Sequence, residues 1–536
     1  MTALKWRIQI AQKDGPTVLM GKTELPEKTG ELHLVPSLPE GTIESVSAVL
    51  PLELEKGERV FLNGYQTWTH CPEYGPKDRL RGLNGIPRPS VKSFGMESYG
   101  DYGFVDYPNR PGLTHGFSYC SFRQGKRFRL FASLDERPGY TIFKYDAKKA
   151  ELRIERDCAG LKCGGDFHAF DLYYAEGTED EVYDGWFKAL GLPAPTAEPI
   201  KGYSSWYNLY EKITEDSIRR DLDGCRTLLQ PGDLFQIDDG WESAVGDWLE
   251  PNKKKFPGGM KKLAEEIHAA GFKAGLWLAP FGCRKGSRLH KEHPDWLLKD
   301  DKGKPWLAGC NWGGFYALDI DLPEVREYLR RVFDRVLYEW GFDFVKLDFL
   351  YAAAPFGNER ESRAGRMIRA LELLRGFCTG KLILGCGVPV MPAFGLVDYC
   401  RISCDVGLDW DNTRWKQLFI REGISTKQAI ENTIYRRPLN GRAYLSDPDV
   451  FYLRKENIKL TEEEKLLLAR VNALLGGVLL TSDDPGTYGD EQRETYREIL
   501  RLFQAKDVYV DPDILRIHYT LDGEARSLQL PAARLN

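Results

Sequence analysis

The sequence lacks the features that mark membrane, secreted or nucleic-acid-binding proteins. No stretch approaches the roughly 20 consecutive apolar residues of a membrane span. The first residues, Met-Thr-Ala-Leu-Lys-Trp-Arg-Ile, carry interleaved charges and have no apolar signal-peptide core. The formal net charge is −5, and there is no run of lysines and arginines to follow a phosphate backbone. We therefore expect a soluble protein with no membrane and no nucleic-acid partner.

Patterns for metals and common cofactors are also lacking. The chain has 8 histidines and 11 cysteines, with no Cys-x-x-Cys pair and no His-Glu-x-x-His. It has no glycine-rich phosphate loop and no Gly-x-Ser-x-Gly turn around a serine nucleophile. An odd number of scattered cysteines is typical of free thiols in a reducing compartment. The sequence predicts a cytoplasmic protein with no metal and no cofactor.

The N-terminal third is rich in short strand-like runs. Residues 1–177 alternate these runs with Gly, Pro, Asp and Asn, and no helical period intervenes, which favours a β-sandwich. One motif, Asn-Gly-Tyr-Gln-Thr-Trp at 63–68, interrupts this alternation of strands and turns. Its aromatic residues Tyr65 and Trp68 belong either to the sandwich core or to a neighbouring cleft. A helix at 178–191 and the proline-rich stretch up to 199 form the predicted linker, 178–199.

Beyond the linker, strand-like runs alternate with amphipathic helices. The eight candidate strands are Gly202–Trp206, Leu234–Ile237, Ala274–Ala279, Phe344–Leu347, Leu382–Gly385, Val397–Ile402, Ala443–Leu445 and Val478–Leu480. Eight such units predict an α/β fold, a (β/α)8 TIM barrel over residues 200–505. An open doubly wound sheet is the rival, but the turn after the first strand has no glycine-rich phosphate motif. Residues 506–536 read as a small C-terminal β-domain, and Thr461 with Glu464 predicts a capping box.

Active groups of TIM barrels gather at the C-terminal ends of the strands. Here these ends carry carboxylates, two cations and several aromatic side chains, and no histidine. The residues are Trp206, Tyr207, Asp238, Asp239, Trp277, Lys346, Asp348, Cys386, Gly387, Arg401, Ser403 and Asp405. A carboxylate site walled by tryptophans suits the cleavage of a glycosidic bond, which needs two carboxyl groups.

Asp348 and Asp405 are the best pair for this reaction. Lys346, on the same strand face as Asp348, should keep that carboxylate ionised for attack. Asp405 must hold a proton, which the negative charge of Asp348 favours. Arg401 would oppose this if it pointed at Asp405, so we expect it to point elsewhere, toward a sugar hydroxyl.

Several of these residues also have ordinary structural readings. Asp238 and Asp239 precede Gly240 and fit a plain turn, while Trp277 alone fits a core residue and Cys386 a packed thiol. The proline in Ser-Asp-Pro-Asp favours a turn role for Asp447 and Asp449. The coincidence of so many polar groups at successive strand ends favours a site.

Seven motifs resemble the retaining α-galactosidases of glycoside hydrolase family 36, which share a clan with family 27. They stand in family order along nearly the whole chain, at 63–68, 205–207 (Ser-Trp-Tyr), 237–241 (Ile-Asp-Asp-Gly-Trp), 275–280 (Gly-Leu-Trp-Leu-Ala-Pro), 346–349 (Lys-Leu-Asp-Phe), 386–387 (Cys-Gly) and 401–405 (Arg-Ile-Ser-Cys-Asp). The resemblance implies an N-terminal β-sandwich, a barrel and a C-terminal β-domain. It also implies Asp348 as nucleophile and Asp405 as acid/base.

The same resemblance assigns the substrate-binding residues. It carries Asp238 and Asp239 onto the galactose 4- and 6-hydroxyls, and Lys346 and Arg401 onto neighbouring hydroxyls. Further residues wall the pocket or surround the 2-hydroxyl, namely Trp68, Trp206, Tyr207, Trp277, Cys386 and Gly387. Two features depart from the family pattern. The C-terminal domain is short, and Tyr65 together with the long loop 283–312 is expected to alter the sites for longer substrates.

The expected function is release of terminal, non-reducing α-D-galactose from melibiose- or raffinose-type oligosaccharides, with retention of configuration. On the same scaffold the alternatives are an α-N-acetylgalactosaminidase and a galactosyl-transferring enzyme. From another class, the alternative is a non-catalytic carbohydrate-binding protein, which the presence of both Asp348 and Asp405 argues against. The expected partner is a small carbohydrate, and monomer and homo-oligomer stay open.

Overall fold

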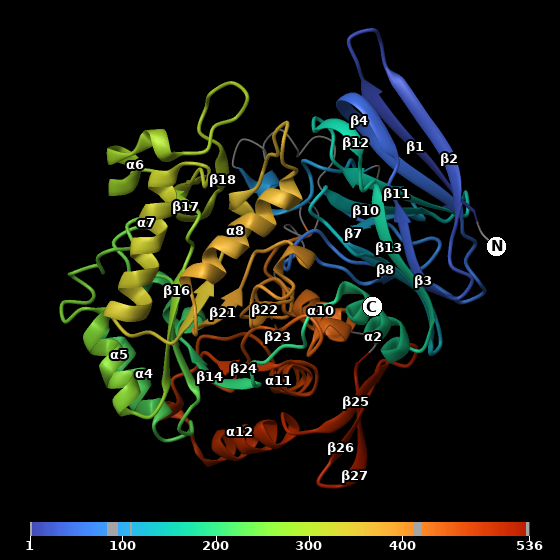
Figure 1. Cartoon of the computed structure of the whole chain (residues 1–536). Helices are drawn as coiled ribbons and strands as arrows, with labels where there is room; N and C mark the ends of the chain where they lie inside the picture. Colours follow the sequence, from blue (N-terminus) through green and yellow to red (C-terminus); the bar gives the residue numbers. More distant parts are fainter. Residues whose placement is uncertain (1–2, 83–94, 108–109, 412–420, 532–534, 536) are drawn as a thin grey trace.

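The structure is a computed structural model that describes residues 3–82, 95–107, 110–411, 421–531 and 535. Figure 1 shows a β-rich N-terminal part beside a barrel with its helices, and a small C-terminal sheet below them. This arrangement confirms the predicted fold class, a TIM barrel with an N-terminal β-sandwich and a small C-terminal β-sheet.

The N-terminal part contains two antiparallel sheets packed face to face. One has the order β2-β1-β4-β11-β10-β7, with β12 paired to β4, and the other β3-β13-β9-β8-β5-β6. Alternate apolar side chains such as Ile8 and Ile154 from the first sheet meet Phe122 and Phe131 from the second in one buried cluster. The strands are β1 Ala3–Ala11, β2 Thr17–Glu24, β3 Thr29–Leu34, β4 Ser37–Pro51, β5 Arg59–Leu62, β6 Glu73–Tyr74, β7 Leu113–Phe117, β8 Tyr119–Gln124, β9 Arg127–Ser133, β10 Tyr140–Asp146, β11 Glu151–Asp157, β12 Lys162–Asp166 and β13 Phe170–Gly177.

Helix α2 (Glu179–Leu190) joins the sandwich to the barrel. A capping box between Thr178 and Glu181 starts it, and Gly191 in the left-handed conformation ends it. Its buried Trp186 donates from Nε1 to the Ser133 carbonyl at 2.9 Å and packs against Phe394 of the barrel. The segment that follows has no regular secondary structure up to β14.

The barrel is built from eight parallel strands in the order β23-β22-β21-β20-β16-β15-β14-β24. Gly477 N donates to the Ser446 carbonyl at 2.8 Å and Phe451 N donates to the Leu480 carbonyl at 3.0 Å, so the two end strands nearly close the sheet. The strands are β14 Ile200–Ser204, β15 Leu234–Ile237, β16 Lys273–Leu278, β20 Phe344–Leu347, β21 Leu382–Gly385, β22 Tyr399–Arg401, β23 Leu445–Asp447 and β24 Val478–Thr481.

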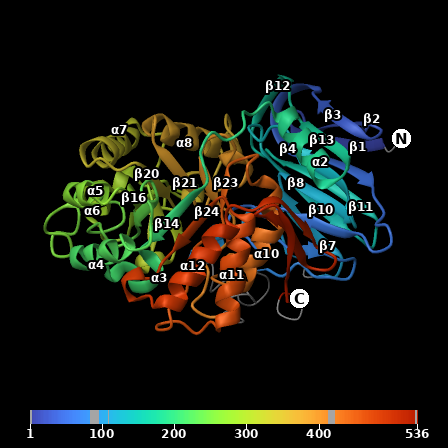
Figure 2. The same ribbon diagram turned by 90° about the horizontal axis from the view of Figure 1, so that it is seen from below.

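Helices surround this sheet, and the sandwich lies to one side of them (Figure 2). Their apolar faces cover the strands, as Val325, Leu329 and Val332 of α7 do. The predicted capping box of Thr461 and Glu464 is present at the start of α11. The helices are α3 Trp206–Leu209, α4 Glu215–Cys225, α5 Met260–Ala269, α6 Arg288–Glu292, α7 Pro323–Phe333, α8 Arg363–Phe377, α10 Thr426–Arg436, α11 Glu462–Leu475 and α12 Asp490–Leu502, with a π-helical turn at Asp334–Glu339.

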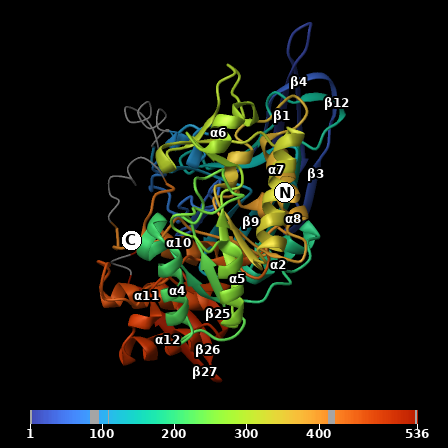
Figure 3. The same cartoon turned by 90° about the vertical axis from the view of Figure 1, so that its left-hand side faces the viewer.

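Two small sheets complete the fold. In the long loop after β16, strands β17 (Gly282–Arg284), β19 (Phe315–Ala317) and β18 (Leu307–Gly309) pair side by side. Strands β25 (Lys506–Asp511), β26 (Arg516–Leu521) and β27 (Glu524–Gln529) form the C-terminal sheet, next to α12 in Figure 3. Within the described ranges, no helix is long and apolar enough to cross a membrane, and no group of three or more His, Cys, Asp or Glu side chains is arranged to hold a metal ion.

Candidate active site

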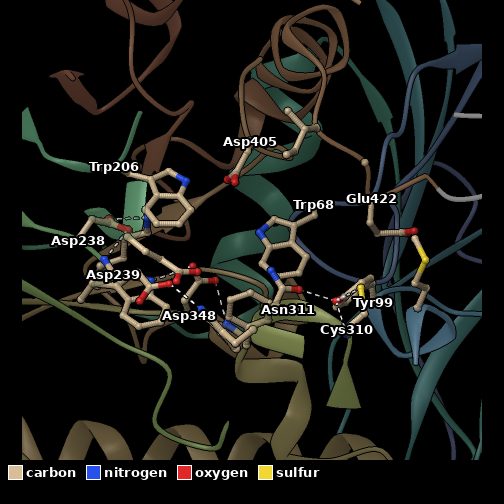
Figure 4. A pocket seen from close by; sticks show the side chains of 18 residues that line it. Trp68, Tyr99, Trp206, Asp238, Asp239, Cys310, Asn311, Asp348, Asp405 and Glu422 are labelled. Atoms are coloured by element: carbon tan, nitrogen blue, oxygen red, sulfur yellow. Dashed lines mark hydrogen bonds and ion pairs between the residues drawn. The ribbon is translucent and has the colours of Figure 1, made fainter. Parts of the chain in front are cut away.

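A cavity of about 370 Å³ opens at the C-terminal ends of the barrel strands. Eight of the predicted site residues line it, namely Trp68, Trp206, Asp238, Asp239, Trp277, Lys346, Asp348 and Asp405. In Figure 4, Asp405 and Asp348 face the same space from opposite sides, with Trp206 and Trp68 flanking it. Side chains that are far apart in the sequence therefore converge where the strand-end argument placed them.

Asp348 is held firmly at the end of β20. Phe349 adopts a left-handed backbone conformation (φ 54°), and its N–H donates to Asp348 Oδ1 at 2.8 Å. Trp277 Nε1 donates to Asp348 Oδ2 at 3.1 Å. Burial raises the pKa of Asp348 above its ordinary value, and Lys346 opposes this shift. These two bonds stabilise the carboxylate, because each donates to its ionised form.

Lys346 pairs with Asp238 and not with its strand neighbour. Its Nζ donates to Asp238 Oδ2 at 2.9 Å, and Gln236 Nε2 donates to the same oxygen at 2.6 Å. The sequence placed Lys346 beside Asp348 because both lie on one strand face, but the side chain reaches across to the end of β15. Asp238 is thus a buried, paired carboxylate, not a residue of a plain turn.

Asp239 lines the cavity and is paired with a second carboxyl group. Its Oδ2 accepts from Trp312 Nε1 at 2.8 Å, and its carboxyl group shares a hydrogen bond with the buried carboxyl of Glu242. Burial and the negative charge of Glu242 raise the pKa of Asp239 well above its usual range. Two adjacent carboxyl groups that share a hydrogen bond hold a proton more readily than an isolated carboxylate does, so Asp239 can be a proton donor as well as an acceptor in the cavity.

The predicted direction of Arg401 is wrong. Its Nη1 donates to Asp405 Oδ1 at 2.9 Å, and Arg401 does not line the cavity. Nε lies 3.1 Å from Asp447 Oδ2 and Nη2 lies 3.0 Å from Asp449 Oδ1. The guanidinium is buried, and its N–H groups need acceptors there because water cannot reach them. It therefore pairs with these three carboxylates.

Asp447, Asp449 and Tyr207 also differ from their predicted roles. Both aspartates are buried partners of Arg401, so they do more than form a turn. Tyr207 donates its hydroxyl to Asp449 and lies outside the cavity lining, so it is not a wall of the pocket. Its helix, α3, begins directly after β14 and turns the ring inward, where it packs against Tyr452.

Trp68 reaches the barrel from the sandwich side. Its ring packs on Phe349 at 5.1 Å and on Tyr351 at 5.9 Å, and Nε1 donates to Cys386 Sγ at 3.3 Å. Gly387 (φ 55°) lies beneath the ring, where a Cβ atom would come within 2.7 Å of it. Cys386 and Gly387 therefore support Trp68 and do not line the cavity themselves.

The other aromatic of the 63–68 motif has the structural role. Tyr65 is buried against Phe104, Phe117 and Tyr140 in a cluster of its own. Tyr65 therefore belongs to the sandwich core, whereas Trp68 of the same motif reaches the cleft of the barrel.

Ten cavity residues were not predicted. They are Met96, Tyr99, Glu211, Cys310, Asn311, Trp312, Phe349, Glu422, Gly423 and Ile424. Trp312 and Asn311 belong to the long loop 283–312, whose length was the available signal. Tyr99 comes from the sandwich insertion and Glu422 from the loop after β22, and nothing in their local sequence marks them.

Known proteins resemble this chain in sequence and in structure. The family model called Melibiase matches residues 198–370. Alpha-galactosidase Mel36A of Lactobacillus acidophilus is 32% identical over 152 residues, 27% of this chain and 20% of that protein. An alpha-galactosidase of Escherichia coli is 27% identical over 197 residues, 35% of this chain and 27% of that protein. The matched segments thus span only about a fifth to a quarter of these curated relatives.

Solved structures match over much longer stretches. TtGalA, an alpha-galactosidase from Thermus thermophilus solved with p-nitrophenyl α-D-galactopyranoside, has a TM-score of 0.73 and 29% identity over 92% of this chain and 98% of its own. The GH36 alpha-galactosidase AgaA from Geobacillus stearothermophilus has a TM-score of 0.61 and 13% identity, over 98% of this chain and 81% of its own, which shows a shared fold.

Proposed function

We propose that this chain, which resembles GH36 α-galactosidases in sequence and fold, hydrolyses terminal non-reducing α-D-galactosides with retention of configuration. One observation carries the proposal. Asp348 and Asp405 line the same cavity, each after a different barrel strand. Asp348 accepts hydrogen bonds from two donors, whereas Asp405 has 34% of its side chain exposed to solvent. Retaining hydrolysis needs such a pair.

The proposed reaction has two displacements. Asp348 attacks the anomeric carbon from the β-face, while Asp405 gives its proton to the departing oxygen of the aglycone. This forms a β-galactosyl ester on Asp348 and releases the alcohol. Asp405, now ionised, takes a proton from water, and the resulting hydroxide attacks the same carbon from the α-face. The ester bond breaks, α-galactose leaves, and both carboxyl groups return to their starting states.

Recognition of galactose is assigned to the polar groups beside Asp348. We keep Asp238 and Asp239 as the groups for the 4- and 6-hydroxyls, supported by the position of both side chains in the cavity lining. Lys346 lines the same wall and can bind a neighbouring hydroxyl while it remains paired with Asp238. The indoles of Trp277 and Trp206 offer apolar surfaces for the C–H faces of the sugar.

Melibiose- and raffinose-type oligosaccharides are the proposed substrates. Besides the groups assigned to galactose, Tyr99, Asn311 and Ile424 line the cavity, so it has room and hydrogen-bonding groups for the aglycone sugar. The structure of TtGalA in complex with stachyose shares 29% identity and has a TM-score of 0.71 over 88% of this chain and 99% of its own, which supports this substrate class.

The proposed compartment is the cytoplasm. All 11 cysteines are free in the structure, and nine of them are buried, namely Cys71, Cys120, Cys158, Cys225, Cys283, Cys378, Cys386, Cys400 and Cys404. Free thiols persist in reducing compartments, which supports this location.

The activity is tested with two variants and azide. Asp405→Ala should still form the intermediate from an aryl α-galactoside with a good leaving group, and azide attack on that β-linked ester should give α-galactosyl azide. Asp348→Ala should lose activity by several powers of ten, and azide attack on the substrate itself should give the β-azide. Swapped product configurations would reverse the two roles.

A substrate panel tests the specificity. Parallel assays on α-galactoside, α-N-acetylgalactosaminide and α-glucoside should show turnover of the first. Preference for the second would move the protein to the acetamido-sugar alternative, and a galactosylated acceptor sugar among the products would move it to the transferases. Turnover of none would leave the non-catalytic alternative.

A further inference from the structure

The guanidinium of Arg401 is shared by three carboxylates. Nη1, Nε and Nη2 lie 2.9 Å from Asp405, 3.1 Å from Asp447 and 3.0 Å from Asp449. Only Asp405 reaches the cavity, with 34% of its side chain exposed, whereas Asp449 is 0% exposed. One cation therefore stands between the proposed proton donor and two buried anions.

This arrangement bears on a conflict within the proposed mechanism. A guanidinium at hydrogen-bond distance stabilises the ionised form of Asp405, but the first displacement needs the protonated form. The positive charge acts on Asp405 less strongly when buried anions on the other side of the guanidinium compensate it. The three carboxylates also carry more negative charge than Arg401 can balance. A proton bound to one of them therefore lowers the energy of the whole cluster.

Asp449 has a strained backbone conformation and a fully hydrogen-bonded carboxylate. Its backbone has φ +81°, a conformation that aspartate tolerates better than most residues but that still costs energy. Four donors hold its carboxylate, namely Arg401 Nη2, the Tyr207 hydroxyl, Val406 N at 2.9 Å and Val450 N at 2.8 Å. Val406 directly follows Asp405, so the same carboxylate also fixes the backbone beside the proposed acid/base.

We propose that Asp449 is a positioning residue for Asp405: its carboxylate compensates the charge of Arg401 and so allows Asp405 to keep the proton that it gives to the leaving oxygen. The inference rests on the proposed function of Asp405. Burial raises the pKa of Asp449 to about 7, but Arg401 opposes this rise and so favours the ionised Asp449 that the compensation requires.

Other ionisable groups also face Asp405 and bear on its proton. They are Arg401 on β22, Asp348 after β20, Asp447 at the end of β23, Asp449 after β23, Tyr207 on α3, Tyr210 after α3, Cys386 after β21 and Cys404 beside Asp405 itself. Among them Arg401 is the cation in direct contact with Asp405, and Asp449 is the fully buried carboxylate that contacts both Arg401 and the backbone after Asp405.

The test is the pH dependence of Asp449→Asn. Asparagine has nearly the same shape and tolerates the positive φ, so the fold should persist. With the compensating charge removed, Asp405 should lose its proton at lower pH, and the alkaline limb of the kcat profile should move down by about one pH unit. The loss of kcat should be at least tenfold greater on melibiose, whose leaving group needs the proton, than on an activated aryl galactoside.

Asp483→Asn is the matched control. Asp483 is also 0% exposed and follows a barrel strand, and its partners are of the same kinds, namely Arg454, the Tyr488 hydroxyl, Leu453 N and Arg454 N. It does not line the cavity. A purely structural role for buried aspartates would make the two variants behave alike. The proposal requires that the pH profile stay in place for Asp483→Asn.

Tyr207→Phe is the second variant, in case Asp449→Asn does not fold. It removes one donor from the Asp449 carboxylate and should move the alkaline limb in the same direction by a smaller amount. An unmoved limb in a folded Asp449→Asn protein, or an equal shift in the control, would overturn the proposal.

A measurement without turnover separates this inference from the proposed function. Infrared difference spectra of the protonated carboxyl band, assigned to Asp405 by its absence in Asp405→Asn, follow the proton directly across pH. In the parent protein this band should persist to higher pH than in Asp449→Asn. If the band shifts as expected but no α-galactoside is cleaved, the proposed function fails and the coupling stands; an identical band in both proteins refutes the coupling.

Discussion

Replacement of Gly387 by alanine should disturb the active site by moving one aromatic ring. A Cβ atom at this position would lie 2.7 and 2.9 Å from Cζ2 and Cη2 of Trp68, and 3.1 Å from the backbone nitrogen of Phe349. Carbon atoms do not approach to 2.7 Å, so the indole must move away by roughly 1 Å to reach ordinary contact. Phe349 N holds Asp348, so the strain also reaches the proposed nucleophile.

Gly380→Ala is the matched control for this change. Gly380 has φ +70° and Gly387 has φ +55°, so both alanines enter the left-handed region and should lose about 1–2 kcal/mol of stability. A Cβ at Gly380 would meet no atom within 4 Å. Any difference in activity between the two variants therefore reports the contact with Trp68 and Phe349.

The assay is steady-state hydrolysis of an aryl α-galactoside, with thermal unfolding measured in parallel. Displacement of reacting groups by about 1 Å can lower the rate by up to about 10²-fold, so kcat/KM of Gly387→Ala should fall by about 10–10²-fold. The Gly380→Ala protein should stay within about twofold of the parent. Equal activities of two equally stable variants would refute the claim that Gly387 positions Trp68 over the pocket.

Three further predictions follow from the same contacts. Lys346→Met leaves Asp238 as a buried unpaired charge and should cost about 3–5 kcal/mol, much of which Asp238→Asn in the same chain should restore in thermal unfolding; no restoration would contradict the pairing. Burial raises the pKa of Glu422 to about 7, so the folded state binds more protons than the unfolded state between about pH 4.5 and 7, and stability falls as pH rises through this window. Glu422→Gln should remove about 3 kcal/mol of this fall, and parallel pH curves of thermal midpoint for parent and variant would contradict it. A crystal structure with bound galactose should place the carboxyl groups of Asp348 and Asp405 about 5–5.5 Å apart, and a gap of about 6.5–9.5 Å would indicate inversion.

The barrel could be predicted because buried parallel strands appear in a sequence as short continuous apolar runs. Leu234–Ile237, Phe344–Leu347 and Leu382–Gly385 have the same limits in the prediction and in the structure. The later strands were placed less well, since β22 is Tyr399–Arg401 and β23 is Leu445–Asp447. Around β22 the apolar run extends past the strand, because Val397 is buried before its first paired residue and Ile402 is buried after its last, joined to β23 only by its N–H, which donates to the Asp447 carbonyl at 3.0 Å.

The positions of the carboxylates were predictable and their partners were not. The end of a barrel strand fixes where Asp348 and Asp238 lie, since the backbone of the strand leaves little freedom. Lys346 and Arg401 have long side chains, and their partners depend on which buried carboxylates compete for them across the barrel. Alternation along one strand does not contain this information.

The aromatic wall of the cavity depends on contacts between the sandwich and the barrel. Trp68 lies in the sandwich part, whereas the proposed catalytic carboxylates lie in the barrel. Arg436, buried at the end of α10, donates to the Thr67 carbonyl beside Trp68 and, at 2.9 Å, to the Ile402 carbonyl at the end of β22, three residues before Asp405. A buried guanidinium is costly unless its N–H groups find acceptors, so the segment that carries Trp68 and the strand end that leads to Asp405 stabilise each other's position. The complete cavity therefore forms when the two parts dock, because the barrel supplies the carboxylates and most of the aromatic wall but the sandwich part supplies Trp68 and Tyr99.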